Sequence, residues 1–154
     1  MAAIKNGFSV DTSMGFSPLE GLIMGSRSGD LDANVINYMI KNLDCKANDI
    51  ISALNNQSGF GAIAGVADSR DLEDLYFDGN EKAVLAINMF CYRIAKYIAS
   101  YIVPLEGIPD ALVFTAGKLI HLIYEYLIKN NSFLKKILII RDWRKITVET
   151  VLDC

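Results

Sequence analysis

A long run of apolar residues at helical spacing, from Glu81 to about Val103, limits most strongly what this chain can fold into. Apolar side chains recur along it every three or four positions, which places them on one side of a helix: Leu85, Ile87, Phe90, Ile94 and Ile98. The pattern predicts an amphipathic helix that lies in the core of the domain.

The composition is that of one ordered domain. Of the 154 residues, 52% are apolar and 21% are charged, which is enough to build a core. The formal net charge of −3 gives no electrostatic reason to expect nucleic acid or an anionic membrane as a partner. No stretch reaches the roughly 20 uninterrupted apolar residues that a membrane-spanning helix needs, and the start lacks the apolar run of a secretion signal. We therefore expect a cytoplasmic protein.

Metal-binding and redox-active side chains are few. Cys45, Cys91 and Cys154 are widely spaced and form no CxxC pair, so neither a disulfide framework nor a zinc site is indicated. His121 is the only histidine, which excludes a metal cluster built from histidines. We interpret His121 as an ordinary helix residue without a catalytic role.

The N-terminal residues predict a β-hairpin. Two short runs typical of strands, Ala2–Lys5 and Phe8–Thr12, flank Asn6-Gly7, a dipeptide that accepts the positive φ angles of a type I′ turn. A short helix is then expected from Ser17-Pro18, because a hydroxyl cap precedes a proline at the first helical position. We expect the following glycines to end that helix.

The middle of the chain predicts further helices and one strand. Helices are expected from about Leu31 to Asn42, from Ala47 to Asn55 with Asn48 as a cap, and from Asp71 to about Phe77. Three glycines interrupt the helical pattern between the second and third of these: Gly59, Gly61 and Gly65. The compact apolar run from Ala111 to Phe114 predicts a buried strand that ends at a small-residue turn.

The composition changes after Gly117. Residues 118–154 carry seven Lys or Arg and four Asp or Glu, a net charge of +3, so residues 1–117 carry −6. The segment retains helical periodicity to about Ile128, but has no turn residues suited to a binding loop. We therefore divide the chain into residues 1–117 and a divergent tail, residues 118–154. Trp143 lies among basic residues, and we interpret its surroundings as a poorly packed tail instead of a nucleic-acid site.

An arginine in a glycine-containing turn is the first candidate for chemistry. Arg27 lies within Met24-Gly25-Ser26-Arg27-Ser28-Gly29, where small neighbours would let its planar guanidinium meet a phosphate without crowding. An arginine in such a turn is also common as a solvated surface residue or as a salt-bridge partner. Asp30 and Asp32 follow, and two acids beside a helix start usually cap it and complement its dipole.

Longer blocks carry a resemblance to a known family. The segment DTSMGFSPLEGLIMGSRSGDLD, from Asp11 to Asp32, closely resembles a block of the acetate kinase family. Further similar blocks extend to Phe114-Thr115-Ala116-Gly117, so that the resemblance covers about three quarters of the chain. It implies an α/β fold, one half of the actin-like, sugar-kinase-like (ribonuclease H-like) ATPase architecture, with a mixed sheet flanked by helices.

The resemblance also implies roles for individual residues. Arg27 matches the arginine that contacts the transferring phosphoryl group, and Pro18 matches a wall of the pocket for the acyl methyl group. The remaining matched positions are implied to line the nucleotide site: Gly25, Asp68, Ser69, Arg70, Thr115, Ala116 and Gly117. The implied reaction transfers a phosphoryl group from ATP to acetate with Mg²⁺ and gives acetyl phosphate and ADP. Acetate, propionate and butyrate all remain possible acceptors.

Parts of the family pattern are not recognisable in this chain. The family's histidine- and glycine-bearing phosphate loop would directly precede Met1, and its loop after Gly117 continues differently from Lys118 onward. The family's metal-associated glutamate also has no counterpart, so we assign no metal ligand. These departures lead us to expect a truncated or frameshifted remnant with little or no activity alone, since several charge-stabilising groups would be missing together.

Other kinds of function remain open at this point. The chain could be a non-catalytic nucleotide-binding or interaction protein, or one half of a split kinase completed by a separate N-terminal half. It could also form a homodimer, or be a stable domain that binds no ligand.

Overall fold

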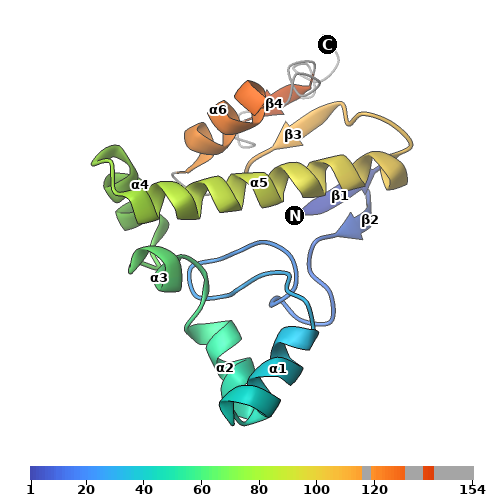
Figure 1. The fold of residues 1–154 in the computed structure, drawn as a ribbon. Helices are drawn as coiled ribbons and strands as arrows, with labels where there is room; N and C mark the ends of the chain where they lie inside the picture. Colours follow the sequence, from blue (N-terminus) through green and yellow to red (C-terminus); the bar gives the residue numbers. More distant parts are fainter. Residues whose placement is uncertain (116–118, 131–136, 141–154) are drawn as a thin grey trace.

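The computed structural model describes residues 1–115, 119–130 and 137–140. It contains strands β1 (Ala2–Lys5), β2 (Phe8–Thr12), β3 (Ala111–Val113) and β4 (Leu138–Ile140). The helices are α1 (Asn34–Leu43), α2 (Ala47–Asn56), α3 (Gly59–Ala64), α4 (Ser69–Phe77), α5 (Glu81–Leu105) and α6 (Ile120–Asn130). Figure 1 shows α5 running across the middle of the molecule, with α6 and strands β3 and β4 on one side and the α1–α2 pair protruding on the other.

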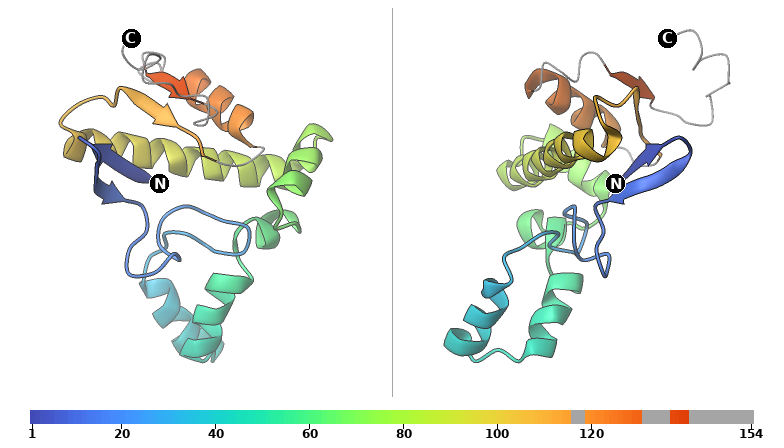
Figure 2. Two further views of the ribbon diagram at one scale, coloured as in Figure 1. Left: turned by 180° about the vertical axis from the view of Figure 1, so that it is seen from behind. Right: turned by 90° about the vertical axis from the view of Figure 1, so that its right-hand side faces the viewer.

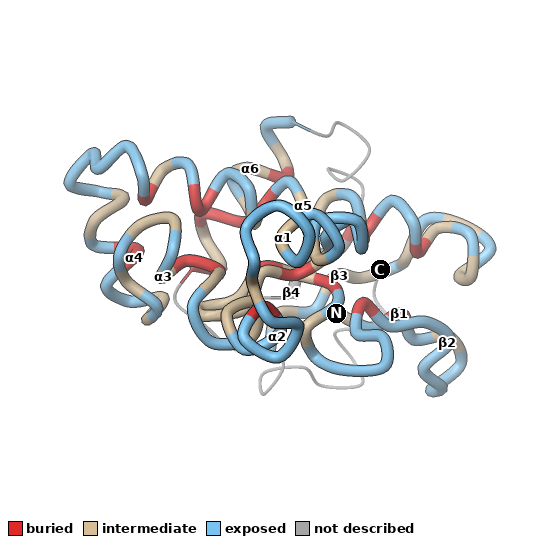
Figure 3. The backbone as a smooth tube through the Cα atoms, turned by 60° about the horizontal axis from the view of Figure 1, so that its bottom comes forward, coloured by how far each residue is buried: buried red, intermediate tan, exposed pale blue. Residues whose placement is uncertain are grey.

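The predicted core helix is confirmed as α5. Its start is fixed by Asn80, whose side-chain oxygen accepts hydrogen bonds from the backbone N–H groups of Lys82 and Ala83. Glu106 ends it in the left-handed conformation, with a φ of 61°. Figure 3 shows buried positions recurring along α5, whereas α1 and α2 are largely exposed.

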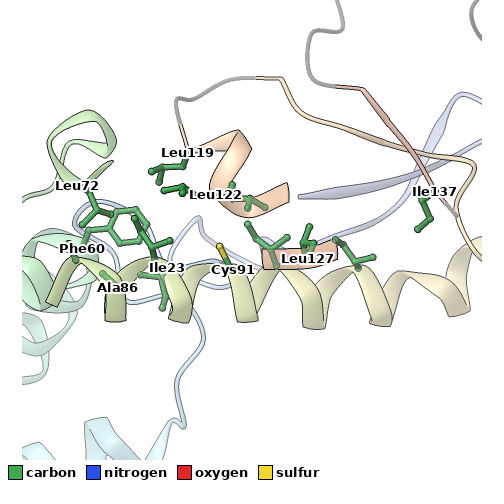
Figure 4. Close-up of a cluster of buried hydrophobic side chains, with 14 residues drawn as sticks. Ile23, Phe60, Leu72, Ala86, Cys91, Leu119, Leu122, Leu127 and Ile137 are labelled. Atoms are coloured by element: carbon green, nitrogen blue, oxygen red, sulfur yellow. The ribbon is translucent and has the colours of Figure 1, made fainter. Parts of the chain in front are cut away.

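The core forms where several segments of the chain pack against α5. Its buried members are Ile23, Phe60, Leu72, Ala83, Ala86, Ile87, Cys91, Ile94, Ile98, Leu119, Leu122, Ile123, Leu127 and Ile137. Figure 4 shows side chains of α6 facing those of α5, with Phe60 and Leu72 at the other end of the cluster. The first part of the tail, as divided at Gly117, thus contributes to the same core as the preceding residues. The division itself stays a prediction.

The predicted N-terminal hairpin is confirmed. β1 and β2 pair antiparallel, with Lys5 opposite Phe8, and a bulge shifts the register between Ala3 and Ile4. The turn residues Asn6 and Gly7 have φ angles of 53° and 82°, as a type I′ turn requires. A second two-stranded sheet joins β3 to β4 in parallel.

The helix expected from Pro18 is absent, and this prediction is wrong. Ser17 Oγ does accept a hydrogen bond from Leu19 N–H at 3.3 Å, as a capping hydroxyl would. The chain then turns away, because Gly21 and Asp30 exchange hydrogen bonds and close a loop: Gly21 N–H donates to Asp30 Oδ1 at 2.7 Å and Asp30 N–H to Gly21 O at 3.1 Å. Contacts distant in sequence thus override the local helix signal.

Three smaller expectations also need correction. Asn48 lies inside α2 and does not cap it, since the capping position is Lys46, which provides no side-chain hydrogen bond. The glycine-rich segment is not a simple interruption, because Gly59 and Gly61 lie within α3. Strand β3 is not fully buried, because Val113 is 43% exposed.

Candidate phosphate-binding site

The turn that carries Arg27, residues 24–28, is held by backbone hydrogen bonds to neighbouring helices. The first turn of α3 and the residue before it donate to carbonyls of the turn: Ser58 N–H to Ser26 O at 2.9 Å, Phe60 N–H to Met24 O at 2.9 Å and Gly61 N–H to Gly25 O at 2.8 Å. On the other side, Ser28 N–H donates to Leu54 O of α2 at 3.0 Å. The path of this turn is therefore set by contacts with α2 and α3, and Ser26 Oγ adds a hydrogen bond to Asn55 O of α2 at 3.0 Å.

Gly59 is what allows the close approach of α3 to the Arg27 turn. Its φ is +63°, and a Cβ atom placed there would lie 1.9 Å from the carbonyl oxygen of Met24 and 2.8 Å from that of Arg27. Any other residue at position 59 would push the turn away. The three-glycine segment, which the sequence showed only as an interrupted helix, is thus part of the site's support.

The Arg27 guanidinium has no acidic partner within the described residues. The side chain is half-buried, and its Nη1 donates to the thioether sulfur of Met24 at 3.7 Å, a soft and weak acceptor. By contrast, Arg70 pairs with Asp68, and Arg93 pairs with Asp30. A half-buried cation without a counter-charge favours an anionic ligand.

Asp30, Arg93 and Tyr97 form a network that the sequence alone did not identify. Arg93 Nη1 lies 2.7 Å from Asp30 Oδ2, and Tyr97 Oη donates to the same oxygen at 2.8 Å. Both partners lie one helical turn apart on α5, and Asp30 closes the loop that carries Arg27. The i, i+4 spacing of a cation and a phenol was the available signal. Asp30 is thus a loop anchor. Asp32 precedes Ala33, the capping residue of α1, and its Oδ1 accepts from Asn34 N–H at 2.8 Å.

The network shifts the pKa of both of its titrating groups. Burial by itself would raise the Asp30 pKa, but hydrogen bonds from Tyr97, Gly21 and Arg93 outweigh it and hold that pKa below 3.8. Burial, followed by the hydrogen bond to Asp30, raises the pKa of Tyr97 to about 12. Asp30 therefore stays ionised and Tyr97 stays protonated over the neutral range.

Part of the predicted nucleotide side lies next to the Arg27 turn. A Cβ placed on Gly25 would lie 2.6 Å from the carbonyl oxygen of Ala67, so the turn abuts the residue before Asp68. Asp68 caps α4 by accepting from Arg70 N–H, and its carboxylate pairs with the exposed Arg70 guanidinium at 2.5 Å. Ser69 is the first residue of α4.

The other predicted positions are not brought to this turn. Thr115 follows β3 and lines a hollow between the two sheets. Ala116 and Gly117 lie outside the described residues. Pro18 is exposed beside a hollow of about 380 Å³ that is lined by its neighbours, among them Phe16, Leu19 and Leu31. The binding roles given to these residues stay predictions.

A cluster of metal-ligating side chains is not found in the described part of the chain. Within residues 1–115, 119–130 and 137–140, no three His, Cys, Asp or Glu side chains come close enough to hold one. We therefore derive no step through Mg²⁺ from this chain's side chains.

His121 joins two helices. Its Nδ1 lies 3.4 Å from Glu73 Oε1, and its ring stacks on Phe77 with centroids 5.6 Å apart. Because His121 belongs to α6 and both partners to α4, the residue that we interpreted as ordinary fastens α6 to the rest of the domain.

Comparison with known proteins decides which family this arrangement represents. A sequence model of the Acetokinase family matches residues 1–120. The chain belongs to the acetokinase family. It is 52% identical over 118 residues to the acetate kinase of Shewanella frigidimarina and 51% identical over 117 residues to that of Campylobacter lari. Each match covers 76% of this chain but 29% of the relative, so the chain spans less than a third of their length.

Solved structures of acetokinase-type enzymes share the fold. The acetate kinase of Porphyromonas gingivalis superimposes with a TM-score of 0.77 at 39% identity, covering 86% of this chain and 34% of that one. A propionate kinase from Francisella tularensis superimposes with a TM-score of 0.80 at 40% identity, covering 86% and 35%. These neighbours have the actin-like ATPase fold, which confirms the predicted fold class. Among the described residues, none of the helices is both long and apolar enough to cross a membrane.

Proposed function

We propose that this chain supplies the phosphoryl-binding arginine and part of the nucleotide side of an acyl-phosphate-forming kinase. The reaction would transfer the γ-phosphoryl group of ATP to acetate, giving acetyl phosphate and ADP, in the cytoplasm. One observation carries the proposal: the half-buried Arg27 guanidinium has no acidic partner in the described chain, although its turn is tied to α2 and α3. The acetokinase family membership supplies the reaction class.

Arg27 would act on charge that grows during transfer. The transferring phosphoryl group spreads negative charge over its three equatorial oxygens, and a planar guanidinium can donate two parallel hydrogen bonds to them. A fixed turn means that little reorganisation is needed when this charge develops. The contacts with α2 and α3, together with the Asp30 network, provide that rigidity.

Residues 1–154 by themselves should catalyse little transfer. Each missing charge-stabilising group costs on the order of 10² to 10³ in rate, and the chain matches only 29% of the relatives' length. ATP, acetate and Mg²⁺ would therefore be handled together with groups outside this segment.

A chimera tests the proposal. Residues 1–120 would replace the matching segment of the S. frigidimarina acetate kinase, and acetyl phosphate formation would be measured as hydroxamate. We expect an active chimera, a loss of at least 10²-fold in kcat on Arg27→Ala, and near-normal activity on Lys82→Ala, which removes an exposed cation at the start of α5. A folded but inactive chimera, or full activity of the Arg27→Ala form, would refute the proposed role.

A further inference from the structure

The thioether sulfur of Met24 lies against the group on which the proposed function depends. Arg27 Nη1 donates to Met24 Sδ at 3.7 Å. The backbones of the two residues are also joined, since Met24 N–H donates to Arg27 O at 3.1 Å, and the Met24 carbonyl accepts from Phe60 N–H at 2.9 Å. The fold of the turn therefore keeps sulfur and guanidinium close together, and a chemical change at the sulfur acts on Arg27 first.

Met24 is placed so that it can be modified without loss of the fold. The residue is half-buried, so that solvent reaches it. In the described part of the chain, neither the buried core nor the half-buried apolar side chains packed on it include Met24. A polar atom added to its sulfur would therefore change the contact with Arg27, whereas the same change at a core methionine would disrupt packing.

We infer that Met24 is a site of reversible oxidation, and that the oxygen of its sulfoxide holds the Arg27 guanidinium. The oxidant would be a peroxide such as hydrogen peroxide. A sulfur lone pair attacks one peroxide oxygen, so that the S–O bond forms and the O–O bond breaks. The second oxygen leaves as hydroxide and takes the proton of the first to become water. The sulfur is thereby oxidised by two electrons, and the peroxide is reduced.

The added oxygen changes the strength of the contact with Arg27. A thioether sulfur is a weak acceptor, whereas a sulfoxide oxygen is strongly polar, and hydrogen bonds from a charged donor are stronger than neutral ones. The sulfur is already in contact with Nη1, so rotation of the methionine side chain is enough to bring the oxygen to the guanidinium. The functional consequence rests on the proposed function: a guanidinium held by the sulfoxide is withdrawn from a phosphoryl group, and oxidation would lower the affinity for ATP.

Peptide mass spectrometry and nitrogen NMR of the full chain test the inference without nucleotide. Increasing doses of hydrogen peroxide should add one oxygen atom to Met24. The side-chain N–H groups of Arg27 should then exchange with water about tenfold more slowly than in the untreated chain, because a hydrogen bond from a charged donor protects them. A methionine sulfoxide reductase should restore both the mass and the exchange rate.

Three variants separate Met24 from other oxidisable residues. Met24→Leu has an apolar side chain of similar volume but cannot form the sulfoxide, so its affinity for ATP should not fall after peroxide treatment. The unaltered chain should lose about tenfold in affinity, and Met89→Leu, which removes a methionine of α5 that is 40% exposed, should lose as much. Met24→Gln, whose side-chain carbonyl is a permanent acceptor, should bind ATP weakly without any peroxide.

The cysteines do not confuse this comparison. All three variants retain Cys45, Cys91 and Cys154, so oxidation of a cysteine would affect them and the unaltered chain alike. Only an effect that passes through the Met24 sulfur disappears in Met24→Leu.

Three results would overturn the inference. They are no oxygen at Met24 at a dose that oxidises Met89, exchange at Arg27 that is the same before and after oxidation, and an equal loss of ATP affinity in Met24→Leu and the unaltered chain. The NMR readout uses no nucleotide and does not depend on the proposed function. Slower exchange at Arg27 with unchanged ATP affinity would contradict the phosphate role of Arg27 alone, whereas unchanged exchange in a chain that binds ATP through Arg27 would contradict this inference alone.

Discussion

At the scale of single residues, the candidate phosphate site depends on a glycine that lies outside the turn that carries Arg27. Gly59 adopts a positive φ and meets the backbone of Met24 and Arg27 more closely than any Cβ would allow. The sequence predicted Arg27 through its glycine-containing turn and through family resemblance. It could not predict the role of Gly59, because that role arises from two segments about 30 residues apart whose packing no local pattern encodes.

Replacing this glycine should damage the site more than a comparable change elsewhere. Gly65 also has a positive φ, of +81°, but nothing lies within 4 Å of an added Cβ. Gly65→Ala should cost about 1–2 kcal/mol from left-handed strain alone. Gly59→Ala should cost roughly 1–3 kcal/mol more, because the methyl group must displace the Arg27 turn. Urea unfolding of both variants measures the difference in stability. Equal losses of unfolding free energy would contradict the close approach of Gly59 to the Arg27 turn.

At the scale of elements, the loop that carries Arg27 is fastened to α5 by an ion pair and a phenol. Asp30 receives both Arg93 and Tyr97, which lie on one side of the central helix. The sequence predicted α5 well, because apolar residues recur at helical spacing along most of its length. It failed at Pro18, where a good local helix start is overridden by the Gly21–Asp30 hydrogen bonds.

The stabilisation from Asp30 should depend on pH in a defined direction. Since its folded-state pKa lies below 3.8, its contribution is present above that value and disappears as the pH falls through the folded-state pKa. Asp30→Asn should lower the free energy of unfolding at pH 7 by about 1 kcal/mol, a charged hydrogen bond discounted for partial exposure. The difference in free energy of unfolding between Asp30→Asn and the unaltered chain should become smaller below pH 3.8.

A neighbouring acid provides the control for this experiment. Asp32→Asn makes the same charge change two residues along, where the carboxylate accepts a hydrogen bond only from its own turn, at Asn34. Thermal unfolding followed across pH 3 to 7 should therefore show a narrowing gap for Asp30→Asn that Asp32→Asn does not reproduce. A gap for Asp30→Asn that is independent of pH would show that the ion pair does not hold the loop.

At the scale of the whole molecule, the fold matches part of a larger kinase. The sequence-based fold class is confirmed, whereas the mixed sheet predicted from resemblance is present as two separate pairs of strands. The sequence could not reveal the hollow between those pairs, because its lining brings together residues of β1, α5 and β3 that are distant in sequence.

The direct test of the phosphate role is ATP binding by the full chain, followed by phosphorus NMR. ATP titrated against the unaltered protein should show a shift or broadening of the γ-phosphorus signal. Arg27→Ala should weaken that binding ten- to a hundredfold, the equivalent of losing a charged hydrogen bond worth about 1.5–3 kcal/mol, and Lys82→Ala should not change it. A γ-phosphorus signal that responds equally in the unaltered chain and in Arg27→Ala, or in neither, would contradict the assignment of Arg27 as the phosphate-binding residue.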